Sequence, residues 1–138
     1  MPDFLFNTQY SDVDKVYAFN RVMKDVSMQE KPDVILLGIP DSLLPLNNKH
    51  RFSFGLYAYE IFNAVQPDFV ITSLMANNGY NDEFYSEISK MAKYKYNVNI
   101  DAYFVSQFCP LSNSIWSEKL SYVYLSRMEL PKTEYKVY

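Results

Sequence analysis

The sequence is poor in cysteine, histidine and glycine, and each shortage excludes a class of site. A single cysteine, Cys109, cannot form an internal disulfide or a multi-cysteine zinc site. A single histidine, His50, means that any metal site would need mostly carboxylate ligands. Three glycines cannot build the glycine-rich phosphate loops of nucleotide-binding proteins, and neither of those motifs occurs. We therefore expect no cofactor and no metal.

Long apolar runs and blocks of basic charge are also missing. No stretch approaches the roughly 18–20 apolar residues that cross a bilayer, and the first residues lack the basic start and apolar core of a signal peptide. The net charge is −3, and the only basic cluster, at 49–51, is too short to hold a nucleic acid by its phosphates. We expect a cytoplasmic protein with no membrane and no nucleic-acid partner.

Aromatic residues are abundant by contrast. The 138 residues include 13 Tyr and 10 Phe, and the hydrophobic share of 49% is enough for one ordered domain covering 1–138. Tyrosine is typical of interfaces, because its ring buries apolar area while its hydroxyl stays hydrogen-bonded. An AT-rich genome would enrich the same residues. Both explanations stay open at this point.

Three segments have helical periodicity. Ser11 caps the first, which should continue to about Gln29, before Pro32. The second, 53–65, is apolar on nearly every side, which is typical of a helix inside the fold or at a subunit interface. Asn81 caps the third, whose acidic start and lysine-rich end match the helix dipole.

The segments 31–42 and 66–77 both run from Pro-Asp into a short apolar stretch. Each predicts a strand, at Val34–Ile39 and at Phe69–Met75, and a further strand is expected at Val98–Val105. Continuous apolar runs are typical of strands covered on both faces, as in a parallel sheet. Alternation with helices then predicts a three-layer α/β sandwich, Rossmann-like or flavodoxin-like, with a mainly parallel sheet.

The two ends of the chain are less regular. The segment 120–126 partly alternates and predicts a C-terminal edge strand. The first strand is either 3–6 or missing from this chain, and 134–138 could pair at a sheet edge or fray.

In an open parallel sheet, ligands bind beyond the carboxyl ends of the strands. That rule selects three loops, and the apolar helix 53–65 adds its one charged residue. The candidate ligand-binding or partner-binding residues are Asp41, Ser42, Asn47, Asn48, His50, Arg51, Glu60, Asn77, Asn78 and Gln107.

Four side chains invite a chemical interpretation beside a structural one. His50 could be a general base or a solvated loop residue, and Arg51 could hold an anion near a helix start. Cys109 has no cation nearby in the sequence to favour a thiolate, so a structural role is preferred. Glu60 either finds a partner, shifts its pKa, or lies on an exposed edge of its helix.

One stretch carries more than periodicity. Its residues are Ile39-Pro40, Leu44-Pro45-Leu46-Asn47, Phe54-Gly55, Ala58-Tyr59-Glu60-Ile61, Ala64-Val65 and Pro67-Asp68, followed by the similar layout of 82–106. This pattern resembles a family of bacterial peptide-maturation proteins, encoded beside radical SAM enzymes that modify small ribosomally made peptides such as bacteriocin precursors. The resemblance implies a pathway but no catalytic residue. Family members are longer, which implies that this chain is a C-terminal domain of a longer protein.

Three functions remain open on this basis. The first is a non-catalytic accessory domain in peptide maturation, which would hold a precursor peptide, a modifying enzyme or a second copy of itself. Its expected surfaces are helix 53–65 and loop 41–51. The second is a small-molecule-binding or enzymatic Rossmann-like domain with its site at the strand ends. The third is a structural dimerisation module.

Overall fold

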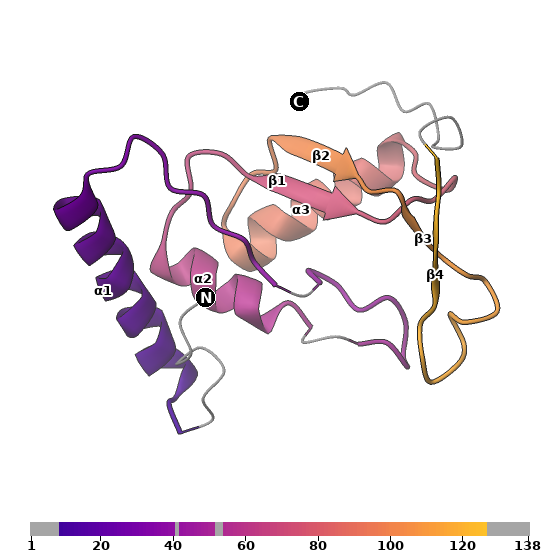
Figure 1. Ribbon diagram of the computed structural model, residues 1–138, viewed down its shortest axis with the longest axis horizontal. Coiled ribbons are helices and arrows are strands. Elements are labelled where there is room, and N and C mark those ends of the chain that lie inside the picture. The colour runs from indigo at the N-terminus through magenta and orange to yellow at the C-terminus, as the bar shows by residue number, and fades with distance from the viewer. Residues whose placement is uncertain (1–8, 41, 52–53, 127–138) are drawn as a thin grey trace. The chain divides into compact units, whose positions relative to one another are not determined.

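The computed structural model describes residues 9–40, 42–51 and 54–126 of a protein with mixed helix and strand. The chain divides into two compact units, which are described separately. The first unit comprises Met1–Pro45 and Phe52–Pro67, and the second comprises Leu46–Arg51 and Asp68–Tyr138. Figure 1 shows the helices and strands of both.

The first unit is built on two helices, α1 (Asp12–Glu30) and α2 (Leu56–Ala64). Ser11 begins α1 with a capping box, because its Oγ accepts from Asp14 N at 3.2 Å while the Asp14 carboxylate accepts from Ser11 N at 3.3 Å. Lys31 ends the helix in the left-handed region, directly before Pro32. The predicted cap and end of this helix are confirmed.

The two helices pack through a small apolar core. Phe19 of α1 lies against Ile61 and Ala64 of α2, and Val16, Met23, Leu37, Ile39 and Val65 surround this centre. Asn20 Nδ2 also donates to Ala64 O at 2.6 Å, which satisfies one of the carbonyls that the end of α2 leaves without a helical partner. The two helices are therefore joined by both apolar and polar contacts.

The predicted strand at Val34–Ile39 is wrong. Val34, Ile35 and Leu36 are 81%, 39% and 92% exposed, whereas Leu37 and Ile39 pack on the α1–α2 core. A strand also needs a neighbour to form its ladder of hydrogen bonds, and no described strand pairs with this segment. An apolar run that we interpreted as buried on both faces is thus exposed over its first half and packed only at Leu37 and Ile39.

The second unit begins with a β–α–β arrangement. Strands β1 (Ile71–Leu74) and β2 (Ala102–Val105) pair in parallel from Ile71–Ala102 to Leu74–Val105, and helix α3 (Asp82–Tyr96) connects them (Figure 1). Asn81 caps α3 by accepting from Phe84 N at 2.8 Å, as predicted. Both strands are shorter than expected.

The second unit ends in an antiparallel ribbon. Strands β3 (Phe108–Pro110) and β4 (Tyr122–Tyr124) form a separate two-stranded sheet. The strand expected at 120–126 is confirmed in shorter form, but it pairs with β3 in this separate sheet and is not an edge of the parallel one, and β3 itself lies where we expected a loop. The possible strands at 3–6 and 134–138 lie outside the described residues.

Candidate functional site

Asn47 organises residues 46–51, the part of the predicted loop 41–51 that belongs to the second unit. Its Oδ1 accepts from Lys49 N and His50 N, both at 2.8 Å, while Leu46 N donates to His50 O at 2.9 Å. Its Nδ2 donates to Ile115 O at 2.8 Å. The side chain therefore shapes this loop and ties it to the segment between β3 and β4.

The neighbouring loop residues also bond to main-chain atoms. Arg51 Nε donates to Asn48 O at 2.9 Å, and Lys49 Nζ donates to Trp116 O at 2.7 Å. Ser42, in the first unit, bonds to the main chain of Leu44 in a short turn. Asp41 lies outside the described residues.

The candidates at the other strand ends have structural roles as well. Asn77 Oδ1 accepts from Gly79 N at 2.8 Å in an exposed turn that includes Asn78. Gln107 Nε2 donates to Leu125 O at 3.0 Å, and its Oε1 accepts from Tyr124 Oη at 2.6 Å. These bonds shape turns and the β3–β4 ribbon, so they do not by themselves define a ligand site.

Glu60 is the predicted site residue with the most unusual environment. It is 4% exposed, and its Oε1 lies 3.2 Å from Lys15 Nζ of α1, which lies equally close to Asp12 Oδ1. Its Oε2 is buried without a hydrogen-bond partner among the described residues. Lys15 is the partner that we expected for this carboxylate, and the alternative of an exposed helix edge is wrong.

Opposing effects set the pKa of the two charged groups. Burial raises the pKa of Glu60, the hydrogen bond and charge of Lys15 lower it, and the Asp12 carboxylate adds to the rise. Burial alone would lower the pKa of Lys15, but the hydrogen bonds and charges of Glu60 and Asp12 outweigh it and raise the pKa. The cluster joins α1 to α2.

Within the described ranges, no group of three or more His, Cys, Asp or Glu side chains could hold a metal ion.

A surface that the sequence interpretation missed lies on the β3–β4 ribbon. Phe108, Tyr122 and Tyr124 are 53%, 46% and 62% exposed. Phe108 is paired with Tyr124 and Pro110 with Tyr122, so all four side chains project from one side, which we call the aromatic face. The rings of Phe108 and Tyr124 meet edge to face, with their centroids 5.6 Å apart.

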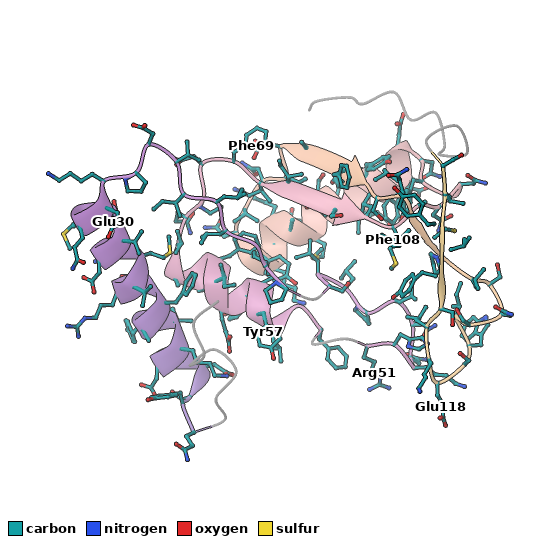
Figure 2. All side chains as sticks on the ribbon, in the orientation of Figure 1. Glu30, Arg51, Tyr57, Phe69, Phe108 and Glu118 are labelled. Carbon is teal, nitrogen blue, oxygen red and sulfur yellow. The ribbon has the colours of Figure 1, made fainter. Side chains whose placement is uncertain are left out.

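The loop between β3 and β4 is held by a buried serine. Ser114 Oγ donates to Leu111 O at 2.8 Å and lies 3.1 Å from Ser121 O, and it accepts from Ser121 N at 3.0 Å. The loop carries the exposed Trp116, and Figure 2 labels Phe108 on β3 and Glu118 in this loop. Residues 107–111 and 121–125 contain no charged side chain. The ribbon is therefore an apolar surface with an ordered connection.

The partial alternation of polar and apolar residues in SYVYLS (121–126) was the sequence signal for β4, which forms half of this surface. The other half, Phe108-Cys109-Pro110, is too short to show any alternation. Its pairing with β4 is what brings the aromatic residues together.

Comparison with known proteins finds no matching family model, no matching curated protein and no matching solved structure. No described helix is long and apolar enough to cross a membrane.

Proposed function

We propose that this chain is a non-catalytic binding domain that holds a peptide or protein segment on the aromatic face. The observation that carries the proposal is the exposure of three aromatic rings on one uncharged two-stranded ribbon. Clustered exposed apolar side chains usually indicate a binding partner, and tyrosine and phenylalanine are enriched where proteins meet. We prefer this ribbon as the binding site over helix 53–65 and loop 41–51, the two surfaces expected from the sequence.

The biological setting of the proposal rests on the resemblance described from the sequence. It points to bacterial ribosomal-peptide maturation in the cytoplasm, with a precursor peptide or its modifying enzyme as the partner. A Rossmann-like three-layer sandwich is part of the same proposal. The parallel β1–β2 pair joined by α3 supports it, because this β–α–β arrangement is the unit from which such sandwiches are built.

The test is binding of the precursor peptide encoded beside the gene, measured by isothermal titration calorimetry. Tyr122→Ala and Tyr124→Ala should each weaken binding about tenfold or more, because exposed aromatic anchors dominate interface energies. Tyr94→Ala is the matched control, since Tyr94 is a tyrosine on α3 that is 88% exposed. Equal affinity for all three variants would overturn the proposed surface, and absence of binding by the unmodified chain would overturn the proposed partner.

A further inference from the structure

We infer that the outer edge of β4 binds an extended peptide as an added strand, through the main-chain groups of Tyr122 and Tyr124. This inference rests on the proposed function and specifies how the aromatic face would hold its partner. It depends on which main-chain groups of the ribbon point outward and on whether anything already engages them.

The register of the ribbon fixes the direction of each main-chain group. Leu125 N donates to Gln107 O at 2.8 Å at one end, and Leu111 N donates to Ser121 O at 2.9 Å at the other. In an antiparallel pair, hydrogen-bonded and non-hydrogen-bonded residue pairs alternate. Phe108–Tyr124 and Pro110–Tyr122 are therefore the non-hydrogen-bonded pairs, and their N–H and C=O groups point away from the partner strand.

The outer edge of β3 is closed to a further strand. The outward carbonyl of Phe108 already accepts from Ala76 N at 2.8 Å. Pro110, the other outward-facing residue, has no N–H to donate. Strand addition on this side would lack both the acceptor and the donor that a neighbouring strand requires.

Within the part of the chain that the structure describes, the outer edge of β4 has no such protection. Among the described residues, no main-chain hydrogen bond engages the outward groups of Tyr122 and Tyr124. The strand contains no proline and no charged side chain, which are the usual means of blocking an exposed edge. This edge therefore offers two donors and two acceptors in the spacing of a β-ladder.

The absence of charged side chains from the ribbon limits which peptide can bind there. Because residues 107–111 and 121–125 carry no charge, a charged side chain placed over the ribbon would lose water without gaining a partner. An added strand places every second side chain beside the aromatic face. The occupant is thus an extended, uncharged peptide segment with apolar, β-branched residues at alternate positions.

The first experiment uses an acetylated and amidated peptide of alternating valine and threonine, titrated into the full chain and followed by amide NMR. We expect shifts at 121–125 and at least tenfold slower hydrogen exchange of the Tyr122 and Tyr124 amides. The same peptide N-methylated throughout keeps its side chains but loses its donors, and it should bind about tenfold more weakly or worse.

The second experiment compares two variants of the chain. Tyr122→Ala removes the ring and keeps the outward N–H, whereas Tyr122→Pro removes both. Proline is compatible with this register, because Pro110 occupies the matching outward position across the ribbon. Tyr122→Pro should bind the valine–threonine peptide about tenfold more weakly than Tyr122→Ala, while the chemical shifts of α3 stay unchanged.

The outcomes separate this inference from the proposed function. If N-methylation and proline leave affinity unchanged while removal of the rings weakens it, the aromatic face binds through side chains alone and strand addition is refuted. If neither peptide binds the full chain, the inference is refuted, whether another part of the chain or a second copy covers the edge. The proposed function then depends on the precursor-peptide titration described above.

Discussion

Replacing Lys15 with methionine tests the ion pair between α1 and α2. Methionine keeps most of the aliphatic stem and removes the ammonium group that lies 3.2 Å from Glu60 Oε1. Glu60 would then be a buried carboxylate whose second oxygen already lacks a partner among the described residues. Breaking a buried pair from one side is more damaging than removing both partners, because one charge stays buried without compensation.

The size of the effect follows from the proton that Glu60 can take up. A glutamate with an ordinary pKa of about 4.3 costs about 3.7 kcal/mol to neutralise at pH 7 and about 1 kcal/mol at pH 5, at about 1.36 kcal/mol per pH unit. These values are upper limits on the cost of burying Glu60 without Lys15. If burying the charged carboxylate would cost more, the group takes up a proton and is buried in its neutral form. We predict that Lys15→Met lowers the free energy of unfolding by up to about 3.7 kcal/mol at pH 7 and up to about 1 kcal/mol at pH 5, less the part that the raised pKa of Glu60 already costs the unmutated chain.

The direction of the pH dependence follows from the raised pKa. Burial raises the pKa of Glu60 in the folded state, so the folded state holds this proton more tightly than the unfolded state. The contribution of the protonated carboxyl to stability is fully present below the unfolded pKa and is lost as the pH rises through the folded pKa. Lys15→Met removes the ammonium group that lowers the pKa of Glu60, so this pKa should rise further. Stability is then lost with rising pH over a wider pH range than in the unmutated chain.

The assay is urea unfolding at both pH values, with hydrogen exchange of the α1 and α2 amides to report on the first unit alone. The control is Lys15→Met/Glu60→Gln, in which the residual side chain cannot titrate, so the part of the pH dependence that Glu60 causes in Lys15→Met should be absent. A loss below about 1 kcal/mol at pH 7, or an equal loss at both pH values, would refute the argument that Glu60 is buried and held by Lys15.

Three further changes test local interactions. Ser11→Ala should destabilise α1 by about 1 kcal/mol, measured by urea unfolding, because it removes the cap on Asp14 N; an unchanged midpoint would contradict this role. Asn20→Ala should lower the free energy of unfolding by about 1–2 kcal/mol in the same assay, because it leaves the buried Ala64 carbonyl without its side-chain donor. A loss of stability confined to the second unit would contradict this role. Asn47→Ala should speed amide exchange at 49–50 about tenfold or more while α3 is unaffected, because Asn47 Oδ1 accepts from both amides; unchanged exchange there would show that the main chain alone holds the loop.

The helices could be predicted because their signals are local. Ser11 and Asp14 are three residues apart and form the capping box by themselves. Asn81 caps α3 in the same way, and the acidic start and basic end of that helix lie within its own sequence. Such features need no knowledge of the rest of the fold.

The strands could be predicted less well because a ladder needs a partner from elsewhere in the chain. Val34–Ile39 has the composition of a buried strand, yet half of its side chains face solvent in the structure. Phe108–Pro110 is three residues long and contains a proline, so it lacks any strand signal of its own. Only the pairing with β4 makes it a strand, because it leaves Pro110 at a position where no N–H is required.

The candidate site residues show the same difference between features visible in the local sequence and features that depend on a distant part of the chain. Glu60 could be singled out because one carboxylate in an apolar helix is a local contradiction, but its partner Lys15 lies 45 positions earlier in the chain. Asn47 and Asn77 were selected because they lie in loops that follow predicted strands, but in the structure their side-chain amides build turns. Residue type alone cannot distinguish those two uses.

The unequal edges of the ribbon lead to a last prediction about self-association. If a second copy occupied the β4 edge, two ribbons would join through their β4 strands, and the outer strands would then be the two β3 strands. Both of those edges are closed by Pro110 and by the Ala76–Phe108 hydrogen bond. Any assembly through this edge would therefore stop at a two-fold dimer, because a closed symmetric contact leaves no site for growth. Sedimentation equilibrium should show monomer and dimer only, and the valine–threonine peptide should shift that balance towards monomer. Larger oligomers that resist the peptide would show that a different surface drives association.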